Sequence, residues 1–115
     1  MIKFTALNRK PTLKEKKLIA FLVEKANIKL PENWEKNLLV RPKEDAGMGG
    51  LYLIPNGIVE QSRFFSRKIS EYQFKDKDGI ETIAYLDINN KDNLFELDIW
   101  KTDFSPFRNK KIKPL

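Results

Sequence analysis

The chain has 115 residues and a net charge of +6 at pH 7, and it contains neither histidine nor cysteine. Histidine is the usual acid or base near neutral pH, and cysteine supplies thiolate nucleophiles and sulfur ligands. Their absence excludes Ser–His and Cys–His catalysis, nearly all zinc sites and all disulfide bonds. The sequence therefore predicts a protein that is not an enzyme and that has no catalytic residue, cofactor or bound metal.

The length is that of one domain, and no apolar run approaches the roughly 20 residues of a membrane span. The first residues lack the apolar core and the small-residue cleavage site of a signal peptide. We therefore expect a cytoplasmic protein without membrane association.

Basic residues are concentrated at the two ends of the chain. Residues 1–29 carry eight Lys/Arg against two acids, whereas residues 30–107 carry ten against fourteen. Four further cations close the chain: Arg108, Lys110, Lys111 and Lys113. We expect a single domain over residues 1–107 and a basic C-terminal tail over 108–115. The tail residues are candidates for nucleic-acid contacts through counterion release, and a purely solubilising charge is the alternative.

One amphipathic helix is predicted near the N-terminus, over about residues 13–27. Thr12 and Glu15 have the spacing of a capping box, in which each side chain satisfies a backbone N–H at the helix start. Apolar residues then recur at helical spacing: Leu18, Ile19, Leu22 and Ala26. This apolar stripe is expected to pack on a sheet.

Short apolar segments joined by Asn, Asp and Gly turns predict that sheet. They cover residues 38–40, 51–54, 69–75, 80–88 and 94–102, with 58–65 as a further strand or an irregular edge. Strands at such close spacing are typical of an antiparallel meander. The expected fold is therefore α+β, with one principal N-terminal amphipathic helix packed on an antiparallel meander sheet of about five strands.

Two predicted turns have compositions that also occur at ligand sites. One is glycine-rich, and its backbone N–H groups are accessible to a small ligand or anion; its candidate residues are Asp45, Gly47, Gly49 and Gly50. The simpler interpretation is that it only connects two strands. The other turn, Asp-Lys-Asp-Gly at residues 76–79, resembles the start of a calcium loop but lacks the later ligands, so a hairpin turn is predicted.

The last predicted strand contains the candidate partner-binding residues. Alternation along a strand places Phe95, Leu97 and Ile99 towards the helix. The opposite, exposed face then carries the candidates: Glu96, Asp98 and Trp100. Tryptophan is enriched at binding hot spots, which favours a protein interface. Two carboxylates at this separation also occur in acid/base catalysis, but a solvated or salt-bridged face is the commoner arrangement.

These segments, in this order, resemble an uncharacterised bacterial family of small domains of unknown function. The resemblance runs from the capping segment near Thr12 to about Phe107. It includes the glycine-rich turn 45–51, the turn 76–79 and the closing stretch 94–106. Ala46 stands where the pattern of the family has a glycine. The resemblance implies one compact domain, and it implies no catalytic residues.

Three hypotheses of function remain. The leading one is a small non-enzymatic domain that binds an unidentified protein partner, such as an immunity or antitoxin-like protein or an accessory protein of a mobile element. A homodimer stays open as a variant of this hypothesis. The second is nucleic-acid binding through the basic termini. The third is a small-ligand domain or an enzyme at the glycine-rich turn, which requires Asp45, Glu96, Asp98 or Tyr85 to share one pocket; strand alternation predicts that no such pocket forms.

Overall fold

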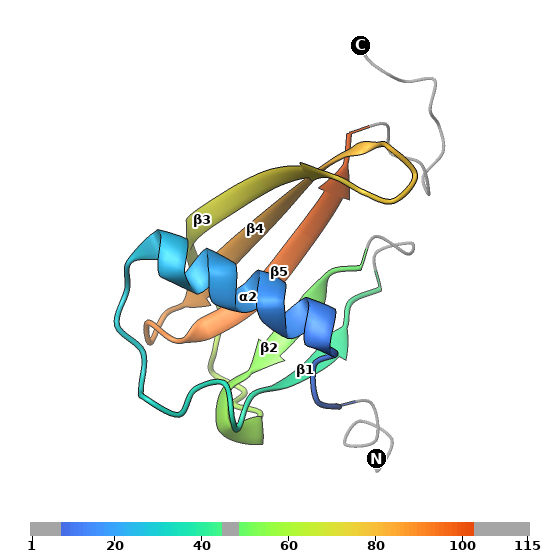
Figure 1. Ribbon diagram of the computed structural model, residues 1–115. Coiled ribbons are helices and arrows are strands. Elements are labelled where there is room, and N and C mark those ends of the chain that lie inside the picture. The colour runs from blue at the N-terminus through green and yellow to red at the C-terminus, as the bar shows by residue number, and fades with distance from the viewer. Residues whose placement is uncertain (1–7, 45–48, 103–115) are drawn as a thin grey trace.

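The predicted helix packs on one face of a five-stranded antiparallel sheet in the structure, a computed structural model that describes residues 8–44 and 49–102 (Figure 1). The elements, in chain order, are α2 (Leu13–Ala26), β1 (Leu39–Pro42), β2 (Leu51–Ile54), the 3-10 turn η1 (Pro55–Gly57), β3 (Phe65–Lys75), β4 (Glu81–Asn89) and β5 (Leu94–Lys101). This arrangement confirms the predicted α+β class. Within the described residues, no helix has both the length and the apolar character needed to cross a lipid bilayer.

Helix α2 begins and ends where its capping residues predict. The Thr12 side chain accepts a hydrogen bond from the Glu15 backbone N–H at 3.1 Å, and Glu15 Oε1 accepts one from the Thr12 N–H at 2.9 Å. The Arg9 guanidinium lies 2.8 Å from the same carboxylate. Asn27 closes the helix in the left-handed conformation (φ 56°), which asparagine tolerates better than most residues.

The sheet has the strand order β1-β2-β5-β4-β3, and every neighbouring pair is antiparallel. One unit is the β1–β2 hairpin, and the other is a meander of β3, β4 and β5. The two units join where β2 pairs with β5 over only two residue pairs, Leu51↔Leu97 and Tyr52↔Glu96. The last strand therefore lies in the middle of the sheet, and β3 forms the far edge (Figure 1).

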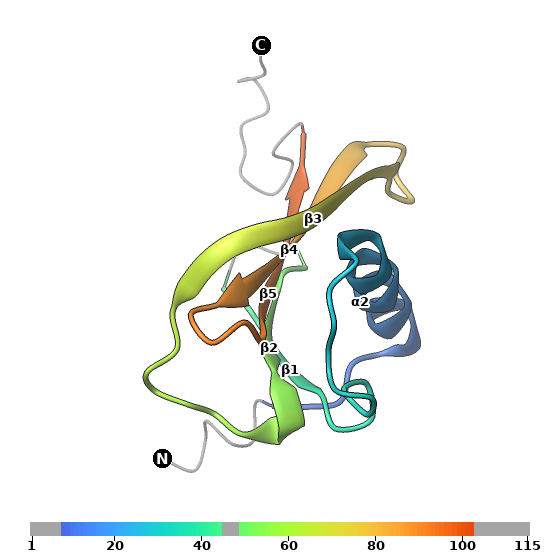
Figure 2. The same cartoon turned by 90° about the vertical axis from the view of Figure 1, so that its left-hand side faces the viewer.

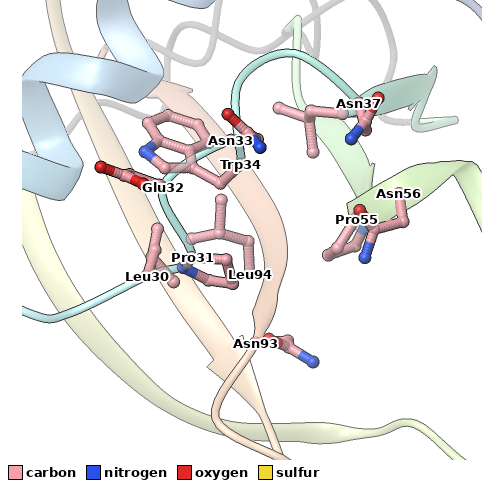
Figure 3. A pocket seen from close by; sticks show the side chains of 11 residues that line it. Leu30, Pro31, Glu32, Asn33, Trp34, Asn37, Pro55, Asn56, Asn93 and Leu94 are labelled. Carbon is pink, nitrogen blue, oxygen red and sulfur yellow. The ribbon is translucent and has the colours of Figure 1, made fainter.

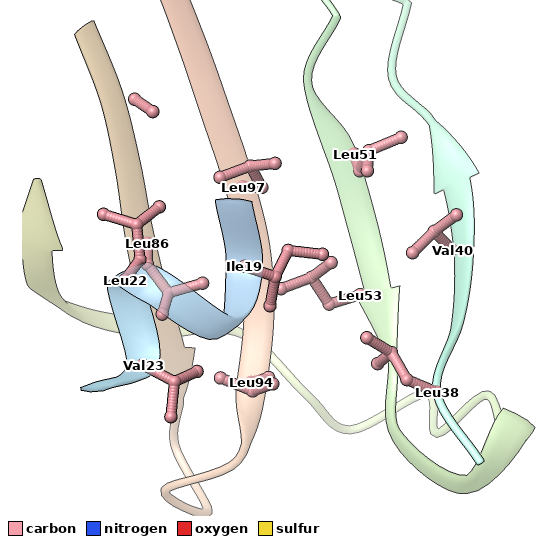
Figure 4. Close-up of a cluster of buried hydrophobic side chains, with 11 residues drawn as sticks. Ile19, Leu22, Val23, Leu38, Val40, Leu51, Leu53, Leu86, Leu94 and Leu97 are labelled. Carbon is pink, nitrogen blue, oxygen red and sulfur yellow. The ribbon is translucent and has the colours of Figure 1, made fainter. Parts of the chain in front are cut away.

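The core lies between α2 and the sheet (Figure 4). Ile19 and Leu22 of the helix are fully buried, as are Leu53, Leu86 and Leu97 of three strands. Removing each such side chain from water contributes roughly 1.5–3 kcal/mol. Figure 2 shows that α2 covers one face of the sheet only, so the opposite face has no second layer of helix or strand among the described residues.

Two local predictions are wrong. The first concerns β3, which begins at Phe65 rather than at Ile69, whereas residues 58–64 form no strand and so match the irregular alternative for that segment. In β5, Leu94 faces the core in place of Phe95, because a bulge interrupts the pairing: the Asp87↔Glu96 pair is followed by Ile88↔Leu94. A bulge adds one residue to one strand and shifts the alternation beyond it.

The packing of α2 generates a stability prediction. Leu22→Ala removes a fully buried side chain, so we expect the free energy of unfolding to fall by about 2–5 kcal/mol. Leu13→Ala is the matched control, because Leu13 lies in the same helix and is 68% exposed. Urea unfolding followed by circular dichroism measures both. Equal losses for the two variants would contradict this account of the core.

Candidate functional site

The sheet face that α2 leaves uncovered is the candidate site, and we name it the open face. Because Leu51 and Leu53 are buried towards α2, the Tyr52 side chain between them points to the opposite side. The same alternation and the contacts below place further side chains on the open face: Arg41, Lys43, Lys68, Tyr85, Asp87, Glu96, Asp98 and Trp100.

Cations lie over two tyrosine rings of the open face. Arg41 and Lys43 both lie over Tyr52, at 5.0 and 5.4 Å from the ring centroid. Lys68 lies over Tyr85, with its Nζ 4.3 Å from the centroid. Contacts of this kind contribute roughly 0.5–1 kcal/mol at exposed sites and more where water is excluded. They order long side chains across an otherwise uncovered sheet.

A lysine and three carboxyl groups meet at the centre of the open face. The Lys43 ammonium lies 2.5 Å from Asp98 Oδ1 and 3.5 Å from Glu96 Oε1. One carboxylate oxygen each from Asp87, Glu96 and Asp98 lies within 4.8 Å of the other two. We name these four residues the acid–lysine cluster. Of the described residues, its three acids are those with the spacing to hold a metal ion, and Lys43 already supplies them with a cation.

Asp87 is the buried member of the acid–lysine cluster. Its residue is 3% exposed, and its Oδ1 atom has no hydrogen-bond partner. Burial, followed by the negative charges of Glu96 and Asp98, raises the pKa of the Asp87 carboxyl to about 8. Asp87 is therefore mostly protonated at neutral pH.

Lys43 stays charged in spite of its partial burial. Burial acts to lower the pKa of its ammonium, but the hydrogen bond to Asp98 and the negative charges of Asp98 and Glu96 outweigh that effect and raise the pKa. Near neutral pH the cluster thus contains the ammonium of Lys43 and the protonated carboxyl of Asp87.

The glycine-rich turn positions Lys43. The Lys43 backbone N–H donates a hydrogen bond to the Gly50 carbonyl at 3.0 Å, which extends the β1–β2 pairing by one step. Gly49 has φ +95°, a conformation that side chains with a Cβ rarely adopt. Gly49 and Gly50 therefore lie in the connection between β1 and β2, and a role in ligand binding stays a prediction.

Arg63 closes the gap that opens where β2 and β5 separate. Its guanidinium donates to the Leu94 and Leu53 carbonyls, each at 3.2 Å, and lies 4.9 Å from the Phe95 ring centroid. These two carbonyls belong to strands that stop pairing after Tyr52, so the arginine satisfies acceptors that the sheet leaves without a ladder partner.

The structure brings the three partner-binding candidates onto one face, with less exposure for the acids than the sequence predicts. Trp100 is 43% exposed. The side chains of Glu96 and Asp98 are only 18% and 30% exposed, because both form ion pairs with Lys43. The salt-bridged arrangement is confirmed, and the freely exposed one is wrong. The pairing lysine comes from beyond β1, across β2, rather than from the adjacent strand.

Several candidates lie outside the described residues. They are Asp45 and Gly47 of the glycine-rich turn and the tail residues Arg108, Lys110, Lys111 and Lys113. The turn at 76–79 is described, and it is a hairpin turn in which Gly79 has φ +83°. Lys101 of β5 lies 2.9 Å from Asp76 and 2.5 Å from Asp78, so these carboxylates have a cation from the chain itself.

Two cavities of the described part lie away from the open-face acids. One of about 390 Å³ lies between α2 and the sheet, where Gly49 meets Leu18, Phe74 and Ile99. Another of about 240 Å³ lies beside Trp34, at the opposite end of β2. Neither is lined by Tyr85, Glu96 or Asp98. Tyr85, Glu96 and Asp98 lie together on the open face instead, and Asp45 lies outside the described residues.

Sequence reasoning missed Asp87 and Lys43. Asp87 occurs within an apolar strand segment, Tyr85 to Ile88, where the even residues face the core. That alternation predicts that Asp87 lies on the opposite face. A single acid in an apolar strand also indicates a polar cluster, since acids are rarely buried unless they are paired. Lys43 had no such signal, since its contact with Glu96 and Asp98 depends on strand order.

The raised pKa of Asp87 predicts how stability varies with pH. In the unfolded chain this carboxyl ionises near its ordinary pKa of 3.8, whereas in the folded protein it ionises only at about 8. Between these values the folded state holds a proton that the unfolded state has lost, so the free energy of unfolding falls as pH rises, by on the order of a few kcal/mol. Above about pH 8 this contribution levels off.

Asp87→Asn removes this titration while keeping the side-chain shape. We therefore expect the variant to lose much less stability between pH 5 and about pH 9 than the wild type, as measured by urea unfolding. Glu71→Gln, on the exposed edge strand, is the control and should keep the wild-type slope. An unchanged slope in Asp87→Asn would contradict the assignment of the proton to Asp87.

Comparison with known protein families matches residues 8–111 to DUF6984, a domain of unknown function. Comparison with curated proteins and with solved structures finds no match for the chain. The match covers most of the chain, including the helix, all five strands and the acid–lysine cluster. The chain therefore belongs to the DUF6984 family of domains of unknown function.

Proposed function

We propose that the chain is a non-enzymatic protein-interaction domain whose open face binds a partner protein. The observation that carries this proposal is the composition of that face. Tyr52 and Tyr85 lie under cations, and Trp100 is 43% exposed at the end of the same face. Tyrosine, tryptophan and arginine are the residues enriched at interface hot spots.

The charges of the open face suggest the chemistry of the partner. Glu96 and Asp98 are partly buried and paired with Lys43, the exposed Lys68 side chain is paired with Glu71, and Arg41 lies over Tyr52. The face therefore carries charges of both signs, which favours a partner surface whose charges complement them. This is compatible with an immunity or antitoxin-like role, or with an accessory protein of a mobile element.

Nucleic acid is the alternative partner for the open face, because aromatic and basic side chains on a sheet can stack on bases and contact phosphates. Glu96 and Asp98 at the centre of the face oppose it, since they would repel a phosphate backbone that crosses the sheet. A bacterial source and a cytoplasmic location belong to the proposal and rest on the amino-acid sequence alone.

Affinity purification from the native host tests the proposal with two matched variants. Trp100→Ala and Phe21→Ala each remove one aromatic side chain of nearly equal exposure, 43% and 44%, from opposite sides of the molecule. We expect a stoichiometric protein partner that Phe21→Ala retains and Trp100→Ala loses, with an affinity decrease of about 30-fold for a hot-spot residue.

Charge reversal gives a second readout with the purified partner. Lys68→Glu should weaken binding and slow association, whereas Lys17→Glu on the exposed side of α2 should change neither. Equal retention of the partner by both aromatic variants, or the absence of any stoichiometric partner, would overturn the proposal. Salt-dependent binding of single-stranded RNA or DNA would favour nucleic acid, and a concentration-dependent dimer would favour a second copy of the chain.

A further inference from the structure

A second site is present at the end of the sheet, away from the open face. It is a cavity of about 240 Å³ between the segment that precedes β1, the turn η1 and the start of β5 (Figure 3). Its floor is apolar, with Leu30, Leu94 and Pro55 on facing sides and Trp34 at one end. Sites for drug-sized ligands enclose roughly 300–1,000 Å³, so this cavity suits a smaller molecule of about one ring.

The three segments around the cavity are each held by their own hydrogen bonds. Before β1, the Trp34 N–H donates to the Pro31 carbonyl at 3.1 Å. In η1, the Ile58 backbone N–H donates to the Pro55 carbonyl at 3.2 Å. Before β5, the Asn89 carboxamide oxygen accepts from the backbone N–H of Asn93 at 3.1 Å. The cavity is therefore formed without a ligand, which reduces the ordering cost of binding.

Carboxamide side chains surround this apolar floor. Four asparagines line the cavity: Asn33, Asn37, Asn56 and Asn93. In the part of the chain that the structure describes, none of these four carboxamides makes a hydrogen bond. Each can donate two hydrogen bonds and accept two, so the rim matches a ligand whose groups both donate and accept.

The charge of the lining narrows the class of ligand. Among the described residues that line the cavity there is no lysine or arginine, and Glu32 is the one ionisable residue. Phosphates and other anions therefore have no cation to bind, and one exposed carboxylate is too few to hold a divalent metal. A neutral ligand remains, with an apolar face for the floor and hydroxyl or amide groups for the rim.

We propose that this cavity binds a single neutral sugar ring. A sugar ring combines C–H faces, which pack against Leu, Pro and Trp side chains, with hydroxyl groups that both donate and accept hydrogen bonds at its edge. A nucleobase has a similar size but presents two flat π faces and fewer hydroxyl-like groups. The cavity shares no residue with the open face, so sugar binding and partner binding are tested independently.

The two tryptophans of the chain make the test specific. Trp34 and Trp100 are its only tryptophans, so Trp100→Phe leaves the cavity residue as the sole indole reporter. The probes are glucose, galactose, mannose and N-acetylglucosamine, each titrated alone. We expect the Trp34 emission to change on addition of at least one sugar, with a dissociation constant on the order of 1 mM for a ligand of this size.

Variants of the cavity rim show whether the change in emission comes from sugar bound in the cavity. The exposed pair Asn33→Ala/Asn37→Ala should weaken the interaction at least about tenfold, corresponding to the loss of one to two well-placed hydrogen bonds. Trp34→Phe, with Trp100 as the reporter, should show no emission change. Saturation-transfer NMR on the wild type gives a readout that does not depend on either tryptophan.

Three outcomes would overturn the proposal. The first is no response to any of the four sugars at ~50 mM, well above the affinity expected for one ring. The second is a response that Asn33→Ala/Asn37→Ala leaves unchanged. The third is binding of adenosine or uridine without binding of any sugar, which would assign the cavity to a nucleobase.

Discussion

The two parts of the sheet are held in register by the short pairing between β2 and β5. It covers only Leu51↔Leu97 and Tyr52↔Glu96, yet it joins the β1–β2 hairpin to the β3–β4–β5 meander. The same two pairs bring buried leucines together towards α2 and bring Tyr52 beside Glu96 on the open face. Core packing and the acid–lysine cluster are therefore two consequences of one register, because a shift by one residue would exchange the faces.

The divergence of these two strands beyond Tyr52 leaves a gap at one end of the sheet. Arg63 fills the gap between the strands by donating to the carbonyls of Leu53 and Leu94. At the same end of the sheet, the separated strand ends leave room for the cavity between Pro55 and Leu94 (Figure 3). A longer β2–β5 ladder would satisfy the same carbonyls without an arginine and would leave no space for a ligand.

Local signals in the sequence predicted the parts of the fold that depend on neighbouring residues. The capping box of Thr12 and Glu15 located the start of α2, and the segment 51–54 matched β2. The bulge that turns Phe95 away from the core and the position of β5 beside β2 depend on contacts between distant segments, so periodicity could not reveal them. The candidate residues Glu96 and Asp98 were found from alternation, whereas their partner Lys43 required the strand order.

The acid–lysine cluster costs stability as an isolated feature, since burying Asp87 forces its carboxyl to keep a proton at neutral pH. Its members come from β4, from β5 and from the residue after β1, so only the observed strand order brings them together. With only two residue pairs in the β2–β5 ladder, backbone pairing alone distinguishes weakly between registers. The ion pairs of Lys43 with Glu96 and Asp98 form only in the observed register. In another register these half-buried acids would lose their cation, which would destabilise that register. The cluster that forms the centre of the proposed interface thus also selects the arrangement of strands that displays it.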